Sequence, residues 1–494
     1  MFKKGQIFNF AKIKDRKRNN FDLSYSSALT CQMGTLIPIM NMEVVAGDKF
    51  KFNTDMLIRF NPLVAPIYQS IDSYTHFFFV PYRILWDNWE EFITGGKNNT
   101  SVVAKPYINI TVPKNSLADY LGLPTTTKYM NVDAAPFKAY QLIYNEYYRD
   151  QNLIDEIDLH TDLNGSINST LAAPLQVLRK RAWEHDYFTS SLPFAQKGPS
   201  VSLPSGESTI TADGDLRLTP FENGNLSTDA NGYVTSTSGN KQYSSGLKLN
   251  NTTAPTINEF RRALAVQKYQ ELLARAGSRY TEWLRAFFGT SPADARLQRP
   301  EYLGGGKQPV YVQEVLQMSE TKTTALGSFA GKATSAGSSR IVTKEFTEPG
   351  ILMGILSVIP HTAYYQGIPK QWTKFDRFDH FTPQFEHIGE QPVLNKEIYY
   401  SSSGNLDNSV FGYLPRYAEY KYSNDEIHGE FRDTLKYWTL ARSFAELPTL
   451  SKEFVECTPS NEIFAMPDEQ NLLIQLHHNI LAKRKMSVYS TPNI

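Results

Sequence analysis

A strict alternation of side-chain types between residues 50 and 60 constrains the fold more than any other feature of this sequence. Apolar or small side chains occur at every second position, namely Phe50, Phe52, Thr54, Met56, Ile58 and Phe60. Polar and charged residues fill the positions between them, with Leu57 as the exception. Successive side chains of a strand point to opposite faces of its sheet, so this period of two predicts a strand with one buried face. A Gly-Asp turn at positions 47 and 48 is expected to precede it.

Three further segments have the composition of strands and lie far apart in the chain. They are residues 74–80, 353–359 and 398–400, and long stretches rich in Pro, Gly and Asn separate them. Strands so distant in sequence can pair only through non-local contacts, which favours a sandwich or jelly roll over a simple meander. The expected fold class is therefore mainly β.

Helices are predicted as isolated segments within this β framework. Thr256 and Glu259 form a capping-box pattern, and apolar residues then recur at helical spacing until Gly277. A second short helix is expected over 280–288, ending at Gly289. Residues 138–150 and 175–184 are also predicted to be helical.

The net charge of zero, from 50 basic and 50 acidic residues, is a sum of unlike parts. Residues 1–20 carry a net charge of +6 and residues 471–494 a net charge of +3, which leaves −9 for the rest. Basic ends on a mildly acidic body are typical of a protein whose ends contact a polyanion. The alternative is that short basic ends only aid solubility. The candidate nucleic-acid-binding residues are Lys3, Lys4, Lys12, Lys14, Arg16, Lys17, Arg18, Lys483, Arg484 and Lys485.

Membrane insertion and a disulfide scaffold are not expected. Lys3 and Lys4 are followed by further charge rather than by the apolar core of a secretory signal. The longest apolar run, 351–360, is about half the roughly 20 residues that a membrane-spanning helix needs. The chain has only two cysteines, Cys31 and Cys457, which indicates a soluble protein made in a reducing compartment.

No recognisable catalytic or metal-binding motif is present. Gly304-Gly-Gly-Lys307 resembles the end of a phosphate-binding loop, but Gln308 replaces the required Ser or Thr, so we expect only a flexible connection. His387 and Glu390 can share a helix face, yet two ligands do not make a metal site. Trp86, Trp89 and Phe92 can form a ligand pocket or simply pack together. We therefore expect no enzyme activity, no cofactor and no metal.

A polar segment over 205–253, rich in Ser, Thr, Gly and Asn, marks a composition change. We interpret residues 198–255 as a surface insertion that is suited to recognition, although a loop without a function would have the same composition. Two other functions remain open at this point. One is a carbohydrate-binding β-sandwich protein that uses these loops or the Trp86 group, and the other is a hydrolase with an unrecognised carboxylate pair.

Many short motifs, in order over nearly the whole chain, resemble the major capsid protein of the Microviridae, the small icosahedral single-stranded-DNA bacteriophages. The most diagnostic is SPADARLQRPEYLGGG at 291–306. The others are 21–24, 33–34, 74–81, 86–96, 186–190, 192–193, 365–367, 389–391, 395–397, 411–413, 416–420 and 487–490. The similarity is greatest to the gokushovirus-like branch.

This resemblance implies an eight-stranded antiparallel jelly roll with long loops and helical insertions. It implies a basic N-terminal arm over 1–20 and a single capsid domain over 21–494. Sixty copies would enclose circular single-stranded DNA in a single-layer icosahedral shell. Further implied partners are a small basic DNA-packaging protein, other virion proteins and a host cell-surface receptor. The 198–255 insertion would form a protrusion at the threefold axes. The protein would be made in the bacterial host cytoplasm and end in the virion.

Overall fold

The computed structural model describes residues 17–202, 208–212, 226–228, 234–236, 247–251, 256–316, 329–400 and 408–489. The chain divides into two compact units. The larger unit is Met1–Pro193 together with Arg279–Ile494, and the smaller unit is Phe194–Ser278. Among the described residues, no helix has the length and apolar character needed to cross a lipid bilayer.

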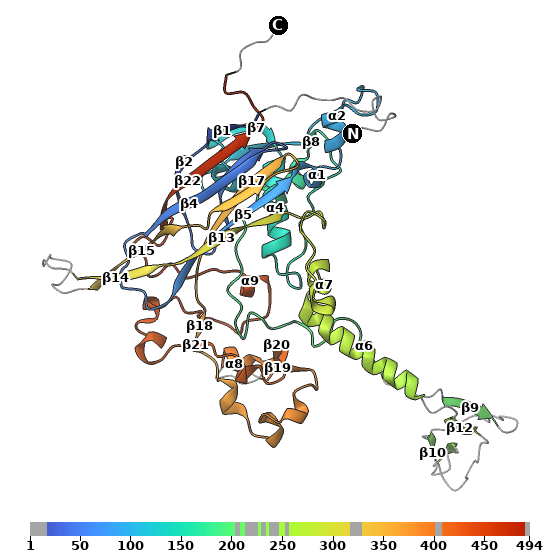
Figure 1. Cartoon of the computed structure of the whole chain (residues 1–494). Coiled ribbons are helices and arrows are strands. Elements are labelled where there is room, and N and C mark those ends of the chain that lie inside the picture. The colour runs from blue at the N-terminus through green and yellow to red at the C-terminus, as the bar shows by residue number, and fades with distance from the viewer. Residues whose placement is uncertain are drawn as a thin grey trace. The chain divides into compact units, whose positions relative to one another are not determined.

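Two antiparallel sheets form the centre of the larger unit (Figure 1). The seven-stranded sheet has the order β1-β22-β4-β15-β14, and in addition β2 pairs with β22 and β16 pairs with β4. Its strands are β1 (Asn19–Asp22), β2 (Tyr25–Cys31), β4 (Lys49–Phe60), β14 (Tyr311–Leu316), β15 (Phe329–Ser338), β16 (Val342–Glu345) and β22 (Leu472–Arg484). The four-stranded sheet has the order β13-β5-β17-β3. Its strands are β3 (Ile37–Val44), β5 (Ile71–Pro81), β13 (Glu301–Pro309) and β17 (Gly350–Pro360). The expectation of a mainly β fold with non-local pairing is confirmed.

The alternation in β4 acts as predicted. All six side chains at the even positions from Phe50 to Phe60 are buried, and those at the odd positions are exposed or half-buried. The buried side packs against the four-stranded sheet, where the ring centroids of Phe52 and Phe77 lie 5.1 Å apart in an edge-to-face contact. A hydrophobic core therefore fills the space between the two sheets.

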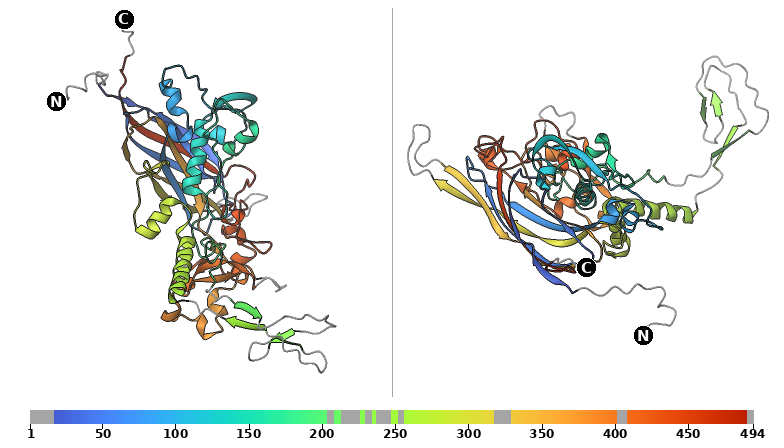
Figure 2. Two further views of the ribbon diagram at one scale, coloured as in Figure 1. Left: turned by 90° about the vertical axis from the view of Figure 1, so that its right-hand side faces the viewer. Right: turned by 90° about the horizontal axis from the view of Figure 1, so that it is seen from above.

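The four-stranded sheet is covered on both faces. Its second face, which includes Phe78 and Met353, packs against helices α1 (Tyr82–Leu85) and α4 (Ala135–Ile143) and strand β6 (Tyr107–Val112). Figure 2 shows this helical layer beside the sheets. All eleven residues of β17 are buried, which explains why its sequence is continuously apolar while that of β4 alternates.

Shorter elements complete the larger unit. They are α2 (Trp89–Thr94), α3 (Leu117–Tyr120), β7 (Thr126–Asp133), the π-helical turn Tyr144–Tyr148, β8 (Ser166–Ile167), α5 (Ser169–Ala172), α7 (Tyr280–Phe288), β18 (Ala363–Tyr364), β19 (Glu390–Leu394), α8 (Asn395–Ile398), β20 (Val410–Pro415), β21 (Asp425–Glu426) and α9 (Lys452–Val455). The predicted helices at 138–150 and 280–288 correspond to α4 with its π-helical turn and to α7.

The described residues of the smaller unit form one long helix and two pairs of short antiparallel strands. Strand β9 (Ser208–Ala212) pairs with β12 (Leu247–Asn251), and β10 (Leu226–Thr228) pairs with β11 (Val234–Ser236). Helix α6 (Ile257–Ala276) has the predicted capping box. The Glu259 amide donates to Thr256 Oγ1 at 3.2 Å, and the Thr256 amide donates to Glu259 Oε2 at 2.8 Å.

Two predicted elements are wrong because tertiary pairing or a local cap overrides the side-chain pattern. Residues 177–184 are not helical, since Lys180 and Ala182 form isolated bridges with Thr35 and Glu456. Residues 398–400 are not a strand. Helix α8 occupies 395–398, and Glu397 accepts a hydrogen bond from the Leu394 amide at 3.0 Å to begin it.

The glycine run at 304–306 is also not the flexible connection that we predicted. It lies within strand β13, which pairs with β5. A Cβ atom on Gly305 would lie 2.0 Å from the Thr75 carbonyl oxygen, so only glycine permits this approach of the two strands. Residues 304–307 are therefore not a phosphate-binding loop, both because they lie in a paired strand and because Gln308 replaces the required Ser or Thr.

Candidate nucleic-acid interface

The two basic ends of the chain meet at one edge of the seven-stranded sheet. Strand β1 pairs with the end of β22, with Asn20 opposite Lys483 and Asn19 opposite Arg484. Lys17 and Arg18 lead directly into β1 and are exposed. Candidates that are more than 460 residues apart in sequence are therefore neighbours in space. The remaining candidates, Lys3, Lys4, Lys12, Lys14 and Arg16, lie outside the described residues.

Strand β4 adds two lysines that the sequence reasoning missed. Lys49 lies directly opposite Lys483, and Lys51 lies opposite Leu481. Lys49, Lys51 and Lys483 are all exposed, because each alternates with a buried neighbour on its strand. The signal in the sequence was a repeated cation on the outward positions at the start of an amphipathic strand. We call Lys17, Arg18, Lys49, Lys51, Lys483, Arg484 and Lys485 the basic strand-end surface.

Two arginines of this surface are engaged in ion pairs. Arg18 Nη2 lies 2.5 Å from Glu345 Oε1, and Arg484 Nε lies 3.0 Å from Oδ2 of the buried Asp48. Arg484 also donates to the Glu43 carbonyl oxygen at 2.9 Å. Its guanidinium therefore anchors the end of β22 to the turn before β4, and its role is structural.

The lysines concentrate positive charge on the exposed side. A hydrogen bond from Arg18 lowers the pKa of Glu345, and the nearby charges of Lys49 and Lys485 lower it further. Lys49 lies between Lys483 on β22 and Glu345 on β16, so one carboxylate offsets part of the repulsion between the two lysines, and the positive charges of the surface remain in excess. This arrangement suits a polyanion such as a nucleic acid backbone.

Comparison with known proteins shows to which family the chain belongs. The model of a family described as "Capsid protein (F protein)" matches residues 11–494. The chain belongs to this capsid protein family. Capsid protein VP1 of Chlamydia phage 1 is 35% identical, over 97% of this chain and 96% of its own length. Capsid protein VP1 of Bdellovibrio phage phiMH2K is 36% identical, over 96% and 95%. Capsid protein VP1 of Spiroplasma virus 4 is 31% identical, over 97% and 95%.

The predicted resemblance to a Microviridae major capsid protein is thereby confirmed. The capsid protein is a structural component of the virion and not an enzyme. The hydrolase alternative is therefore wrong. In the aromatic group of the carbohydrate-binding alternative, Trp86 is buried and its Nε1 donates to Asn164 Oδ1 at 2.8 Å. Trp89 packs half-buried against the core of the capsid protein, and Phe92 is exposed.

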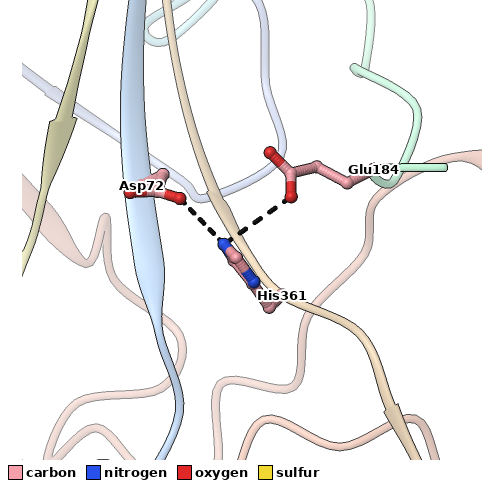
Figure 3. A group of neighbouring side chains, drawn as sticks. All are labelled: Asp72, Glu184 and His361. Carbon is pink, nitrogen blue, oxygen red and sulfur yellow. Dashed lines mark hydrogen bonds and ion pairs between the residues drawn. The ribbon is translucent and has the colours of Figure 1, made fainter. Parts of the chain in front are cut away.

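One cluster of the capsid protein has the residue types of a metal site (Figure 3). His361 Nε2 lies 2.8 Å from Asp72 Oδ2 and 3.6 Å from Glu184 Oε2. Lys307 Nζ lies 2.8 Å from Asp72 Oδ2 and 3.8 Å from Glu184 Oε1. Partial burial opposes the ionisation of Asp72, but hydrogen bonds from Lys307 and His361 outweigh it and lower the pKa of Asp72. Lys307 supplies the positive charge that a metal ion would bring, so the cluster acts as an ion-pair network.

The adjacent histidines of the capsid protein point to opposite faces of β22. His477 is exposed, and its Nδ1 lies 2.8 Å from Ser26 Oγ. His478 is fully buried, and its Nδ1 lies 2.8 Å from Thr54 Oγ1. Among the described residues, neither histidine belongs to a group of three or more His, Cys, Asp or Glu side chains that could hold a metal ion.

Proposed function

We propose that copies of the capsid protein assemble into a single-layer icosahedral shell of 60 subunits, each built on an eight-stranded jelly roll. The strand order supports the jelly roll. Counting β1 with β2 as the first strand and β15 with β16 as the sixth, and setting aside β14 next to β15, the two sheets have the orders 1-8-3-6 and 2-7-4-5. This interleaving of early and late strands is what two Greek keys produce.

We further propose that the basic strand-end surface contacts the single-stranded DNA genome inside the shell. The observation that carries this proposal is that the N- and C-terminal cations meet Lys49 and Lys51 at one end of the paired strands β1, β22 and β4. Contacts of this kind are directed to phosphates, independent of base sequence and sensitive to salt. The N-terminal cations at 3–16 would extend the same contact along the DNA.

The charge of the shell limits what this contact can do. Sixty copies would bring about 600 cations from the two ends, against about 1,500 phosphates in the coding sequence of this chain alone. The shell therefore cannot neutralise its genome. Small cations or a small basic DNA-packaging protein must supply the rest.

Attachment to a host receptor is proposed for the 198–255 insertion. Its polar composition suits a recognition loop, and the resemblance to the gokushovirus-like capsid proteins implies a protrusion in this interval. The protein would be made in the host cytoplasm and would carry out this function in the virion, next to other virion proteins.

Neutralising the exposed lysines tests the DNA contact. The Lys49→Gln/Lys51→Gln/Lys483→Gln variant is expected to bind a single-stranded oligonucleotide roughly tenfold more weakly at low salt. The slope of log affinity against log salt should fall in magnitude by about 2, because three phosphate contacts are lost. Fluorescence anisotropy of a labelled oligonucleotide, titrated with unassembled full-length protein at several KCl concentrations, measures both quantities.

A matched control removes the same charge elsewhere. Lys97, Lys114 and Lys128 are also exposed lysines of the larger unit, and none of them belongs to β1, β4 or β22. Their substitution by Gln should leave the salt slope within error of the wild type. Equal losses in both triple variants would mean that only the total charge matters, and the basic strand-end surface would then have no special role.

A further inference from the structure

A second surface of the larger unit exposes large apolar side chains. Residues 370–381, which we call the aromatic loop, contain Trp372 with 70% of its surface exposed and Phe375 with 89% exposed. The loop consists of short 3₁₀ turns next to β19 and β20 (golden-orange in Figure 1). Large, contiguous exposed apolar groups of this kind mark interaction sites in soluble proteins.

The first half of this loop is held by two buried ion pairs. Lys370 Nζ lies 3.2 Å from Oε1 of Glu397, whose side chain is 1% exposed. Lys374 Nζ lies 2.9 Å from Glu419 Oε1 and also packs over the ring of Tyr420. The backbone on either side of Trp372 is therefore fixed while the indole itself remains exposed.

The second half of the loop is held through its backbone. The Phe378 carbonyl oxygen accepts a hydrogen bond from Arg416 Nη2 at 3.1 Å, and the His380 carbonyl oxygen accepts one from Tyr417 Oη at 3.2 Å. The amide of Phe375 donates to Asp379 Oδ2 at 3.2 Å. Aromatic side chains on a fixed backbone lose little conformational entropy on binding, which is the property of an interface anchor.

The charges near the loop favour a protein partner over DNA. Lys370 and Lys374 are neutralised by Glu397 and Glu419. Arg377 is flanked by Asp376 and Asp379 in the same turn. The exposed aromatic groups therefore lack the positive potential that a surface for single-stranded nucleic acid combines with stacking.

We propose that Trp372 and Phe375 anchor a contact between two copies of this chain in the shell. The inference rests on the proposed assembly, since membership of the capsid family places many copies side by side. The occupant of the aromatic loop is thus a second copy of this chain. The loop thereby adds a specific assembly determinant to the proposed function.

Thiol protection tests the burial of this loop directly. The two natural cysteines, Cys31 and Cys457, are both buried, so a maleimide reagent reports on an introduced thiol. In the Phe375→Cys variant, the thiol should react quickly in unassembled subunits and at least tenfold more slowly in intact particles. Wild-type particles give the background, and particles dissociated in urea give the total. Equally fast labelling of intact Phe375→Cys particles would overturn the inference while leaving assembly itself established.

Truncation of both anchors tests their contribution. The Trp372→Ala/Phe375→Ala variant should fold normally, because both side chains are exposed, but should need at least tenfold more protein to form particles. Gln371→Ala, an exposed polar neighbour, is the matched control and should assemble as the wild type does. Normal particle yield from the double variant, with or without loss of DNA, would contradict the proposal. Absence of particles from the wild type as well would instead contradict the proposed function.

Discussion

Truncation of Phe52 to alanine is expected to lower the free energy of unfolding of the capsid protein subunit by about 3–5 kcal/mol. Phe52 is 1% exposed, and its ring packs edge-to-face on Phe77 of the opposite sheet. The substitution removes buried apolar surface and leaves a cavity between two sheets whose backbones are fixed by long ladders of hydrogen bonds. Urea unfolding of the unassembled subunit, followed by circular dichroism, measures the loss as a lower midpoint.

The neighbouring position gives the matched control. Lys51 precedes Phe52 on β4 and is exposed on the opposite face. Lys51→Ala should change the free energy of unfolding by no more than about 0.5 kcal/mol. If the two substitutions lower the free energy of unfolding equally, the face of β4 on which a side chain lies would not determine its contribution to stability. The alternation in β4 would then not mark a buried and an exposed face.

The strands were predictable where a single strand contains the whole signal. The alternation in β4 needs only one buried face, and this face is visible in eleven consecutive residues. The partners of β4 were not predictable, because β22 and β15 are contributed by distant parts of the chain. The capsid fold could be named from the sequence only through its ordered motifs.

Local signals failed where a contact from elsewhere decided the structure. Gly305 reads as a flexible loop residue, yet its missing Cβ lets β13 approach β5 closely. Lys180 follows a run with helical spacing, yet a bridge to Thr35 holds it extended. In both cases the deciding atom lies more than 100 residues away in the sequence.

The candidate site was predictable in part. The charge imbalance at the two ends identified Lys17, Arg18 and residues 483–485, and the structure brings them together. The sequence alone could not show that Arg484 is committed to the buried Asp48, nor that Lys49 lies opposite Lys483. Both facts depend on strand register. The exposure of Trp372 and Phe375 was likewise hidden, because aromatic residues are usually buried.

Acidification from pH 7.5 to pH 4.5 is expected to destabilise the unassembled subunit by roughly 5 kcal/mol through the buried His478 and the half-buried His76. Burial lowers the pKa of His76 to about 4, and the nearby charge of Arg181 contributes. Burial also lowers the pKa of His478 to about 4, with a contribution from His477. The unfolded chain binds a proton at each histidine near pH 6.5, whereas the folded chain does not until about pH 4. The contribution of the two histidines to the free energy of unfolding is therefore constant above about pH 7, and it falls as the pH is lowered from about 6.5 to about 4.

The measurement is the free energy of unfolding in urea at half-unit steps across this range. Each of the two histidines should contribute a slope of up to about 1.4 kcal/mol per pH unit. His478→Gln should remove about half of the total slope, since Gln can keep a hydrogen bond to Thr54 but cannot take up a proton. His76→Gln should remove the other half, and the double variant should be nearly independent of pH above 4.5.

The adjacent His477 makes this test specific. It differs from His478 by one position and by the face of β22 on which it lies, and its imidazole is in contact with solvent. His477→Gln should leave most of the slope in place, because it removes only the contribution of His477 to the lowered pKa of His478 and leaves that imidazole buried. Any slope that the His76→Gln/His478→Gln variant shows when the titration is extended below pH 4.5 is expected to come from carboxylates such as Asp72, whose pKa is lowered in the folded chain. Its position on the pH axis would therefore separate the two causes.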